Sequence, residues 1–173
     1  MKTNVNENKI EFNNPIKLEL FDAQGNLKWS DEICNGIVDE GIEYILEVAF
    51  NGGAQDTSHY IGLIDNASYT TGLAAADTHA SHSGWIENTD YDEATRELWN
   101  PDTTASRAVT NSTPVEFTMN ASVTIKGIFV SSVSTKGSVS GAAGDYIWAT
   151  ALFSSDAVVV STDVLKVTYT VSG

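Results

Sequence analysis

Alternating hydrophobic and polar residues predict a β-hairpin near the start of the chain. Ile16, Leu18 and Leu20 alternate with charged residues, as in a strand that buries one face. The segment 22–26 (DAQGN) contains a glycine and is typical of a turn. The segment 27–33 then has the composition of a return strand, so we expect an antiparallel pair here.

The segment 39–50 has a helical period. Its apolar residues recur at helical spacing and form one face: Ile42, Ile45, Leu46, Ala49 and Phe50. Asp39 is the predicted N-cap, and Asn51 with the two following glycines predicts the C-terminal stop. A single apolar face usually packs on a sheet, and we expect that arrangement here. A helix that binds a partner is the alternative.

The rest of the chain predicts β-structure interrupted by long loops. Residues 59–64 predict a short strand buried on both faces, and residues 65–110 predict loops with short strands near 84–87 and 96–99. From residue 115 onward, β-branched and aromatic segments are separated by Gly/Ser turns, with strands predicted at 115–119, 123–130, 146–153, 158–160 and 164–171. The pattern as a whole predicts a mostly β protein: an antiparallel β-sandwich, jelly-roll or immunoglobulin-like, with one amphipathic helix and long loops.

The length of 173 residues fits one domain, which we assign to residues 15–173. Residues 1–14 are polar and rich in asparagine, which predicts either an N-terminal arm that orders against a partner or plain disorder. No stretch has the apolar character of a signal peptide or of a membrane span. We therefore expect synthesis in the cytoplasm and release only by cell lysis.

Charge is distributed unevenly and narrows the range of partners. The net charge is −14, and residues 1–102 carry 19 acidic and five basic residues, whereas residues 103–173 carry four of each. The basic residues are scattered, so we expect neither nucleic-acid nor anionic-membrane binding, while a basic protein partner stays possible. Cys34 is the single cysteine, which excludes an intramolecular disulfide, and we expect it to be a small packed residue.

The segment 77–82 (DTHASH) contains residue types that could bind a metal ion. His79 and His82 could share a face and bind Zn²⁺ if His59 supplied a third ligand. The alternative is that this segment hydrogen-bonds locally and orders the loop before Trp85. Asp77, Ser81 and His82 also have the residue types of a nucleophilic triad, but no G-x-S-x-G elbow accompanies them.

Acidic and aromatic residues of the same region allow several interpretations. The carboxylates could bind Ca²⁺, flank a glycosidic bond, or form a solvated loop, which we favour: Asp90, Asp92, Glu93 and Asp102. Trp85, Tyr91 and Trp99 could stack on a sugar or anchor a protein interface. We expect no enzymatic activity and no cofactor, and take these three aromatics as interface candidates.

Several short motifs, in order, resemble a family of structural proteins of tailed bacteriophages. They span most of residues 16–171 and include VDEGIEYILEVAFNGG, YIGLID, DTHASHSGWIENTDYDEATRELW, VEFTMNASVTIKGIFV and LKVTYTV. The resemblance also leads us to expect a closing Gly-Asp-x-Leu-x-Val-x-Tyr motif. Thr162 stands at its glycine position, a departure that touches one turn.

The resemblance implies a β-rich component of the virion, assembled in the host cytoplasm. A capsid decoration or cement protein on the head is the preferred interpretation, and a tail or fibre component that binds a receptor or glycan is the alternative. The implied partners are the major capsid protein and further copies of this chain, in a homo-oligomer. In that role Ile10 and Phe12 are predicted to anchor the N-terminal arm on a neighbouring subunit.

Overall fold

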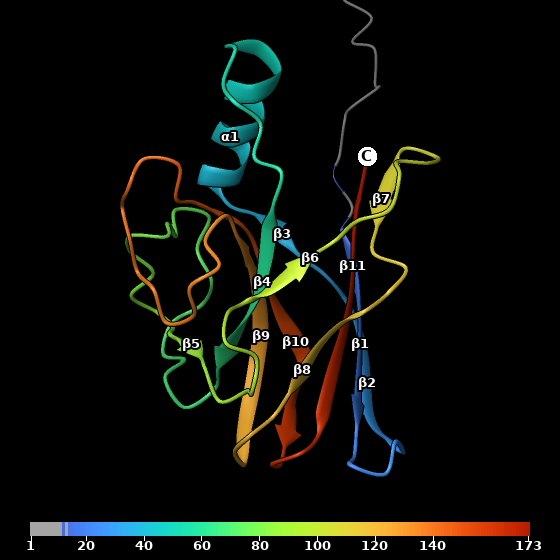
Figure 1. Ribbon diagram of the computed structural model, residues 1–173. Helices are drawn as coiled ribbons and strands as arrows, with labels where there is room; N and C mark the ends of the chain where they lie inside the picture. The colour runs from blue at the N-terminus through green and yellow to red at the C-terminus, as the bar shows by residue number, and fades with distance from the viewer. Residues whose placement is uncertain (1–11, 13) are drawn as a thin grey trace, which may run out of the picture.

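The computed structural model describes residue 12 and residues 14–173, which form two antiparallel β-sheets and one helix (Figure 1). The first sheet has the order β2-β1-β11-β7, with β8 also paired to β11. Its strands are β1 (Pro15–Phe21), β2 (Leu27–Cys34), β7 (Ala108–Thr110), β8 (Val115–Thr118) and β11 (Val164–Ser172). The second sheet has the order β3-β10-β9-β4-β5, with β6 also paired to β4. Its strands are β3 (Gly36–Ile37), β4 (His59–Asp65), β5 (Glu87–Asn88), β6 (Glu97–Trp99), β9 (Val123–Ser131) and β10 (Ile147–Val159).

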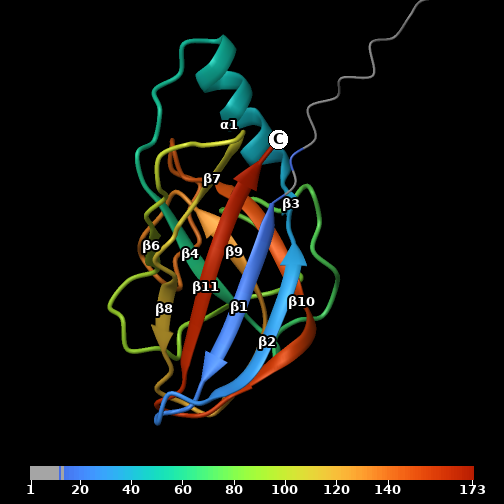
Figure 2. The same ribbon diagram turned by 90° about the vertical axis from the view of Figure 1, so that its right-hand side faces the viewer.

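The two sheets pack face to face around one main core (Figures 1 and 2). In β1 and β11 every second residue is buried, and these side chains form the inner face of the first sheet: Ile16, Leu18, Leu20, Leu165, Val167 and Tyr169. Because strand side chains alternate between faces, the intervening residues face outward. The predicted mostly β fold, an antiparallel β-sandwich with one helix and long loops, is confirmed.

A smaller core lies on the outer side of the second sheet. It consists of buried side chains from several segments: Val38, Ile64, Trp85, Phe129 and Ile147. The loops that follow β4 and β9 cover this side, away from the first sheet (Figure 1). Strand β4 therefore has buried residues on both faces, as its continuous apolar run predicts.

The predicted hairpin is confirmed: β1 pairs with β2, and Gly25 in the turn has a φ of 80°. One strand prediction is wrong, because the two strands expected at 146–153 and 158–160 are one continuous strand, β10. Its pairing with β9 changes register between Leu152 and Ala157, so the chain bends without leaving the sheet. The short strand expected near 84–87 lies at 87–88.

Helix α1 (Asp39–Phe50) has the predicted bounds and projects from the end of the sandwich where β1 begins and β11 ends (Figure 2). The N-cap prediction is wrong, since Val38 occupies that position and no side chain caps the helix. The predicted packing face is also wrong. The helix contacts β10 through Gly41, where an added Cβ would lie 2.2 Å from the carbonyl oxygen of Trp148. This close contact turns Tyr44 and Ile45 toward the core.

Candidate interaction surface

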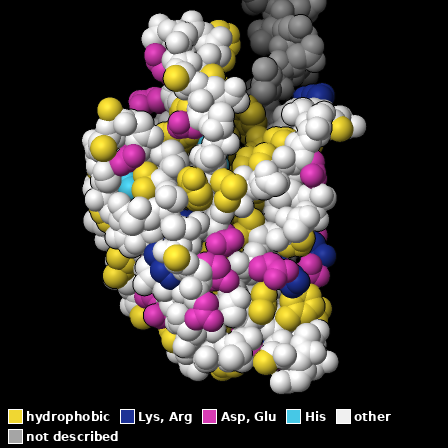
Figure 3. Space-filling model, in the orientation of Figure 1, with side chains coloured by type: hydrophobic (Ala, Val, Ile, Leu, Met, Phe, Trp, Pro, Cys, Tyr) yellow, Lys and Arg dark blue, Asp and Glu magenta, His cyan; other side chains and the backbone are white. Residues whose placement is uncertain are grey.

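The apolar face of α1 is exposed to solvent. Ile42, Leu46 and Phe50 are 39%, 53% and 82% exposed, and Ala49 between them is exposed as well. These residues are spaced as neighbours on one side of a helix. Figure 3 shows hydrophobic side chains on this projecting element together with carboxylates. An exposed apolar stripe of this kind marks a protein contact surface more often than an isolated exposed leucine does.

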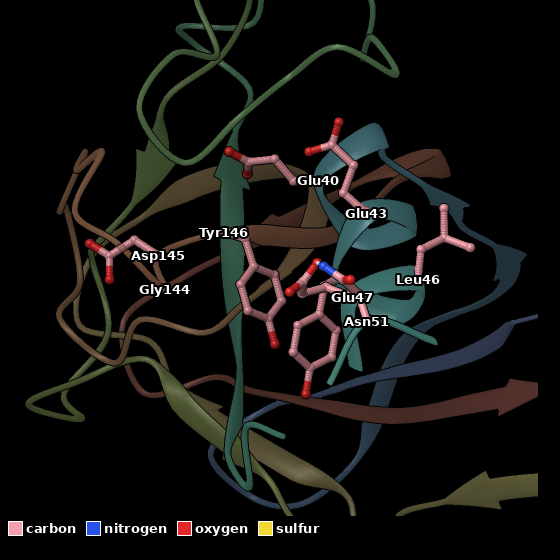
Figure 4. Close-up of a pocket in the computed structure, with 9 residues that line it drawn as sticks. Glu40, Glu43, Leu46, Glu47, Asn51, Gly144, Asp145 and Tyr146 are labelled. Carbon is pink, nitrogen blue, oxygen red and sulfur yellow. Dashed lines mark hydrogen bonds between the residues drawn. The ribbon is translucent and has the colours of Figure 1, made fainter. Parts of the chain in front are cut away.

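An acidic groove of about 600 Å³ lies beside this face, between α1 and residues 144–146 (Figure 4). Glu40, Glu43 and Glu47 approach it from the helix, and Asp145 approaches it from the opposite side. The three glutamates are three and four residues apart, so they share one side of α1. The α1 sequence contains no basic residue, and the groove therefore favours a cationic partner.

Glu40 also fixes the base of the helix to the sandwich. One of its carboxylate oxygens accepts hydrogen bonds from the backbone N–H of His79 at 2.9 Å and from that of Ile147 at 2.8 Å. In addition, the N–H of Asp39 donates to the carbonyl of Ala75 at 2.8 Å. The position of α1 is therefore held by polar contacts with two separate loops, while its apolar side stays uncovered.

Aromatic side chains form the floor between the groove and the core. The rings of Tyr44 and Tyr146 stack with centroids 4.6 Å apart. The hydroxyl of Tyr146 and Nε2 of His59 lie 2.9 Å apart, and the N–H of Asp56 donates to the hydroxyl of Tyr44. Burial lowers the pKa of His59, partly opposed by the Asp56 carboxylate, and burial raises the pKa of Tyr146. His59 and Tyr146 are thus held in their uncharged forms near neutral pH.

The three aromatic interface candidates lie inside the protein. Trp85, Tyr91 and Trp99 are 3%, 1% and 8% exposed. The Trp85 indole N–H donates to Asp77, and the Trp99 indole N–H donates to both the Asn111 side chain and the carbonyl of Tyr169. Their polar atoms are satisfied within the fold, as buried indoles require. Both tryptophans are therefore core side chains, and neither is available to anchor a protein interface.

Tyr91 differs from the two tryptophans in its polar atom. Its ring meets Phe117 edge to face and lies beneath the Lys136 ammonium, whose Nζ is 4.1 Å from the ring centroid. Its buried hydroxyl has no hydrogen-bond partner among the described residues. Burial, with Glu87 as a further cause, raises the pKa of Tyr91. The residue is a core side chain with one unsatisfied polar atom.

His79 and His82 do not converge on a common ligand position. The Arg96 guanidinium donates to Nε2 of His79, and Nδ1 of His79 lies 2.9 Å from the carbonyl oxygen and 3.2 Å from the backbone nitrogen of Ser140. His82 stacks on Trp85 with centroids 4.0 Å apart and donates to the Trp85 carbonyl. In the structure, the contacts of both histidines order the loop that contains them.

Arg96, which the sequence did not single out, organises the loops over the second sheet. It is 2% exposed and makes a two-pronged ion pair with Glu87, at 2.8 and 3.0 Å. It also donates to the carbonyls of Val133 and Ser138. Nothing in the local sequence distinguishes this arginine from an exposed one, because its partners come from distant segments.

The predicted acidic cluster is dispersed. Glu93 accepts from the N–H of Thr118, and Asp102 accepts from that of Ser112. Asp77, considered for a triad, accepts from Trp85 and from the N–H of Ala74. Across residues 12 and 14–173, no group of three or more His, Cys, Asp or Glu residues is arranged to hold a metal ion.

The remaining predicted positions lie at the edge of the described chain or on its surface. Ile10 and most of the predicted arm are outside the described residues, whereas Phe12 is described and is 41% exposed. Asn14 is buried and its carbonyl accepts from the N–H of Asn35, so the folded unit begins there. Cys34, expected to be packed, is exposed at the end of β2.

Comparison with protein-family models, with curated proteins and with solved structures finds no match to this chain. Within the described residues, no helix combines the length and the apolar character needed to cross a membrane.

Proposed function

We propose that this chain is a structural subunit of a tailed-bacteriophage particle, a decoration or cement protein that binds the head shell through protein–protein contacts. The observation that carries the proposal is the exposed apolar face of α1, on a helix that projects from an otherwise well-packed sandwich. The motifs that resemble phage structural proteins support the choice of particle. The acidic groove beside the helix supports a cationic protein surface as the partner.

The exposed face needs a partner for a thermodynamic reason. Burying one leucine-sized side chain contributes about 1.5–3 kcal/mol, so covering Ile42, Leu46 and Phe50 would supply a substantial part of a binding energy. A subunit that assembles in many copies gains further from multivalency, since each weak contact is repeated around the particle. Helix α1 therefore acts as an assembly contact in this proposal.

A receptor- or glycan-binding role in the tail has less support. That alternative depended on Trp85, Tyr91 and Trp99 being available to a ligand, and all three are buried. Stacking on a sugar needs an exposed ring face, which these residues lack.

Antibody labelling of intact virions of the phage that encodes this chain, viewed by electron microscopy, tests the proposal. We expect label distributed over the head, with pre-immune serum as the control. Label confined to the tail would move the protein to the adsorption apparatus, and unlabelled particles from a producing infection would overturn the proposal. Purified chain should also co-sediment with heads that lack it, and Leu46→Gln should weaken this binding.

A further inference from the structure

Deepening the proposed role as an assembling subunit, on which it rests, we infer that the exposed face of α1 binds the N-terminal segment, residues 1–13, of a second copy of this chain. Ile10 and Phe12 of one copy would pack on Leu46 and Phe50 of the next, and Lys9 would approach the glutamates beside them.

Charge excludes the simplest alternative occupant, a second α1. Two copies of this helix placed face to face would bring Asp39, Glu40, Glu43 and Glu47 of each copy close together, with no basic residue on either helix. Like charges at that distance oppose association. The occupant must instead combine apolar side chains with cations.

The N-terminal segment has this combination in its sequence. It contains two basic residues (Lys2 and Lys9), two acidic residues (Glu7 and Glu11) and four apolar residues (Met1, Val5, Ile10 and Phe12), so its side chains carry no net charge, unlike those of α1. Six of the seven basic side chains elsewhere in the chain have partners within the fold: Lys17 with Glu19, Lys28 with Asp163, Arg96 with Glu87, Lys126 with Asp156, Lys136 with Tyr91, and Lys166 with Glu116. The segment 1–13 therefore supplies cations that the sandwich does not use in these pairs.

Position and length also fit. The carbonyl of Asn14 accepts a hydrogen bond from the N–H of Asn35. Asn35 directly precedes β3, the strand that leads into α1. Residues 1–13 thus start at the same end of the sandwich as the helix. Extended, 13 residues reach about 40 Å, whereas a 12-residue helix is about 18 Å long. Ile10 and Phe12 themselves lie within about 14 Å of Asn14, so the pairing requires that α1 of the neighbouring copy lie close to Asn14.

Phe12 indicates that the partner is another copy. It lies two residues from the anchored Asn14 and is 41% exposed, so a large part of its ring is available to a partner. In a neighbour, the same side chain has the exposed Phe50 and Leu46 available. Exchange of segments between copies buries both apolar sets and places Lys9 near the glutamates of α1.

Photo-cross-linking of the full-length chain tests the pairing directly. p-Benzoylphenylalanine replaces Phe12, and this variant is mixed with ¹⁵N-labelled chain that lacks the photoreactive group. After irradiation, mass spectrometry should identify cross-links from position 12 to residues 42–50 in species that contain one light and one heavy copy. Cross-links only within one copy, or only to residues outside α1, would overturn the inference.

Sedimentation equilibrium gives the energetic test. Leu46→Gln and the double change Ile10→Ser/Phe12→Ser should each raise the dissociation constant for self-association by about tenfold or more. Leu27→Gln is the matched control, because Leu27 is 54% exposed at the opposite end of the sandwich, and it should leave the constant within about twofold. Lys9→Glu should weaken association by about fivefold at most, and Glu43→Lys in the same chain should restore it.

The outcomes separate this inference from the proposed function. A full-length chain that stays monomeric at all concentrations and forms no cross-link overturns the inference, even if antibodies label the phage head. Cross-links between copies with no label on particles would instead support the pairing and overturn the proposed location. Circular dichroism of each variant establishes that the sandwich remains folded.

Discussion

Helix α1 and the loops over the second sheet behave in opposite ways. The helix has a clear apolar face, yet that face is exposed, while the polar segment 77–99 buries Trp85 and Arg96. In the loops, the polar atoms of these two side chains meet partners such as Glu87 and Asp77. In the helix, one glycine determines which side meets the sandwich. An apolar pattern thus shows that a segment can bury a face, and the rest of the fold decides whether it does so within one chain.

The largest effect is expected when the loop region loses its central cation. Arg96→Met leaves Glu87 buried without a counter-charge, so the free energy of unfolding should fall by about 3–5 kcal/mol. Urea denaturation at pH 7 measures the loss. The double change Arg96→Met/Glu87→Leu should recover much of it, and Lys17→Met, which removes an exposed ion pair, should cost at most about 1 kcal/mol.

On the helix side, Gly41→Ala tests the close contact with β10. Helix propensity alone favours alanine by about 1 kcal/mol, whereas overpacking against the Trp148 carbonyl costs about 1–3 kcal/mol. We expect net destabilisation in the same urea assay. Gly36→Ala is the control, because an added Cβ there meets nothing within 4 Å. A more stable Gly41→Ala variant would show that the helix does not depend on this contact.

Thr162 lies in the turn between β10 and β11, outside both α1 and the loops over the second sheet. It has a φ of 77°, a left-handed conformation that is unfavourable for a β-branched residue. Its sequence position is the one at which the phage resemblance leads us to expect glycine. Thr162→Gly should therefore raise the free energy of unfolding by about 1 kcal/mol, which thermal unfolding can measure. Unchanged or lower stability would mean that the turn tolerates threonine without strain.

Acid should weaken the fold through the aromatic floor beneath α1. Because burial lowers the pKa of His59 below 6.5, the unfolded chain binds a proton at a higher pH than the folded chain does. Stability is then complete above pH 6.5 and decreases as the pH falls through the lower, folded pKa. Melting temperatures between pH 8 and pH 5 should show this decrease, and His59→Asn should reduce it. Parallel curves for the two proteins would contradict the prediction.

The smallest effect on stability is expected from the exposed residues of α1 that we propose as the association surface. Leu46→Gln and Phe50→Gln remove exposed apolar groups, so each should change the free energy of unfolding by less than about 0.5 kcal/mol. The measurement must use protein dilute enough to be monomeric, since self-association would add to apparent stability. A loss of several kcal/mol would show that this face packs within its own chain.

The features predicted well are those set by short-range periodicity. Alternation located β1 and β2, helical spacing gave the bounds of α1, and a continuous apolar run identified β4 as buried on both faces. Each of these signals lies within a dozen residues, where side-chain direction repeats with a fixed period.

The features predicted poorly depend on long-range contacts. The packing side of α1 follows from the fit of Gly41 against a strand about a hundred residues later in the chain. The groove combines α1 with residues 144–146, and the Arg96 network combines five separate segments. The three glutamates on one side of the helix were the available signal for the groove, and their spacing alone did not reveal what lies opposite them.

The position of β11 has a consequence for how the protein is made. This strand lies between β1 on one side and β7 and β8 on the other, and it follows all of them in the sequence. Ile16 pairs with Tyr169, so the first sheet cannot close until residues 164–172 have left the ribosome. Folding of that sheet is therefore governed by sequence-distant pairing, which is slow. Until then the β1–β2 hairpin exposes an apolar face, and the nascent chain is a natural client for chaperones that bind such surfaces.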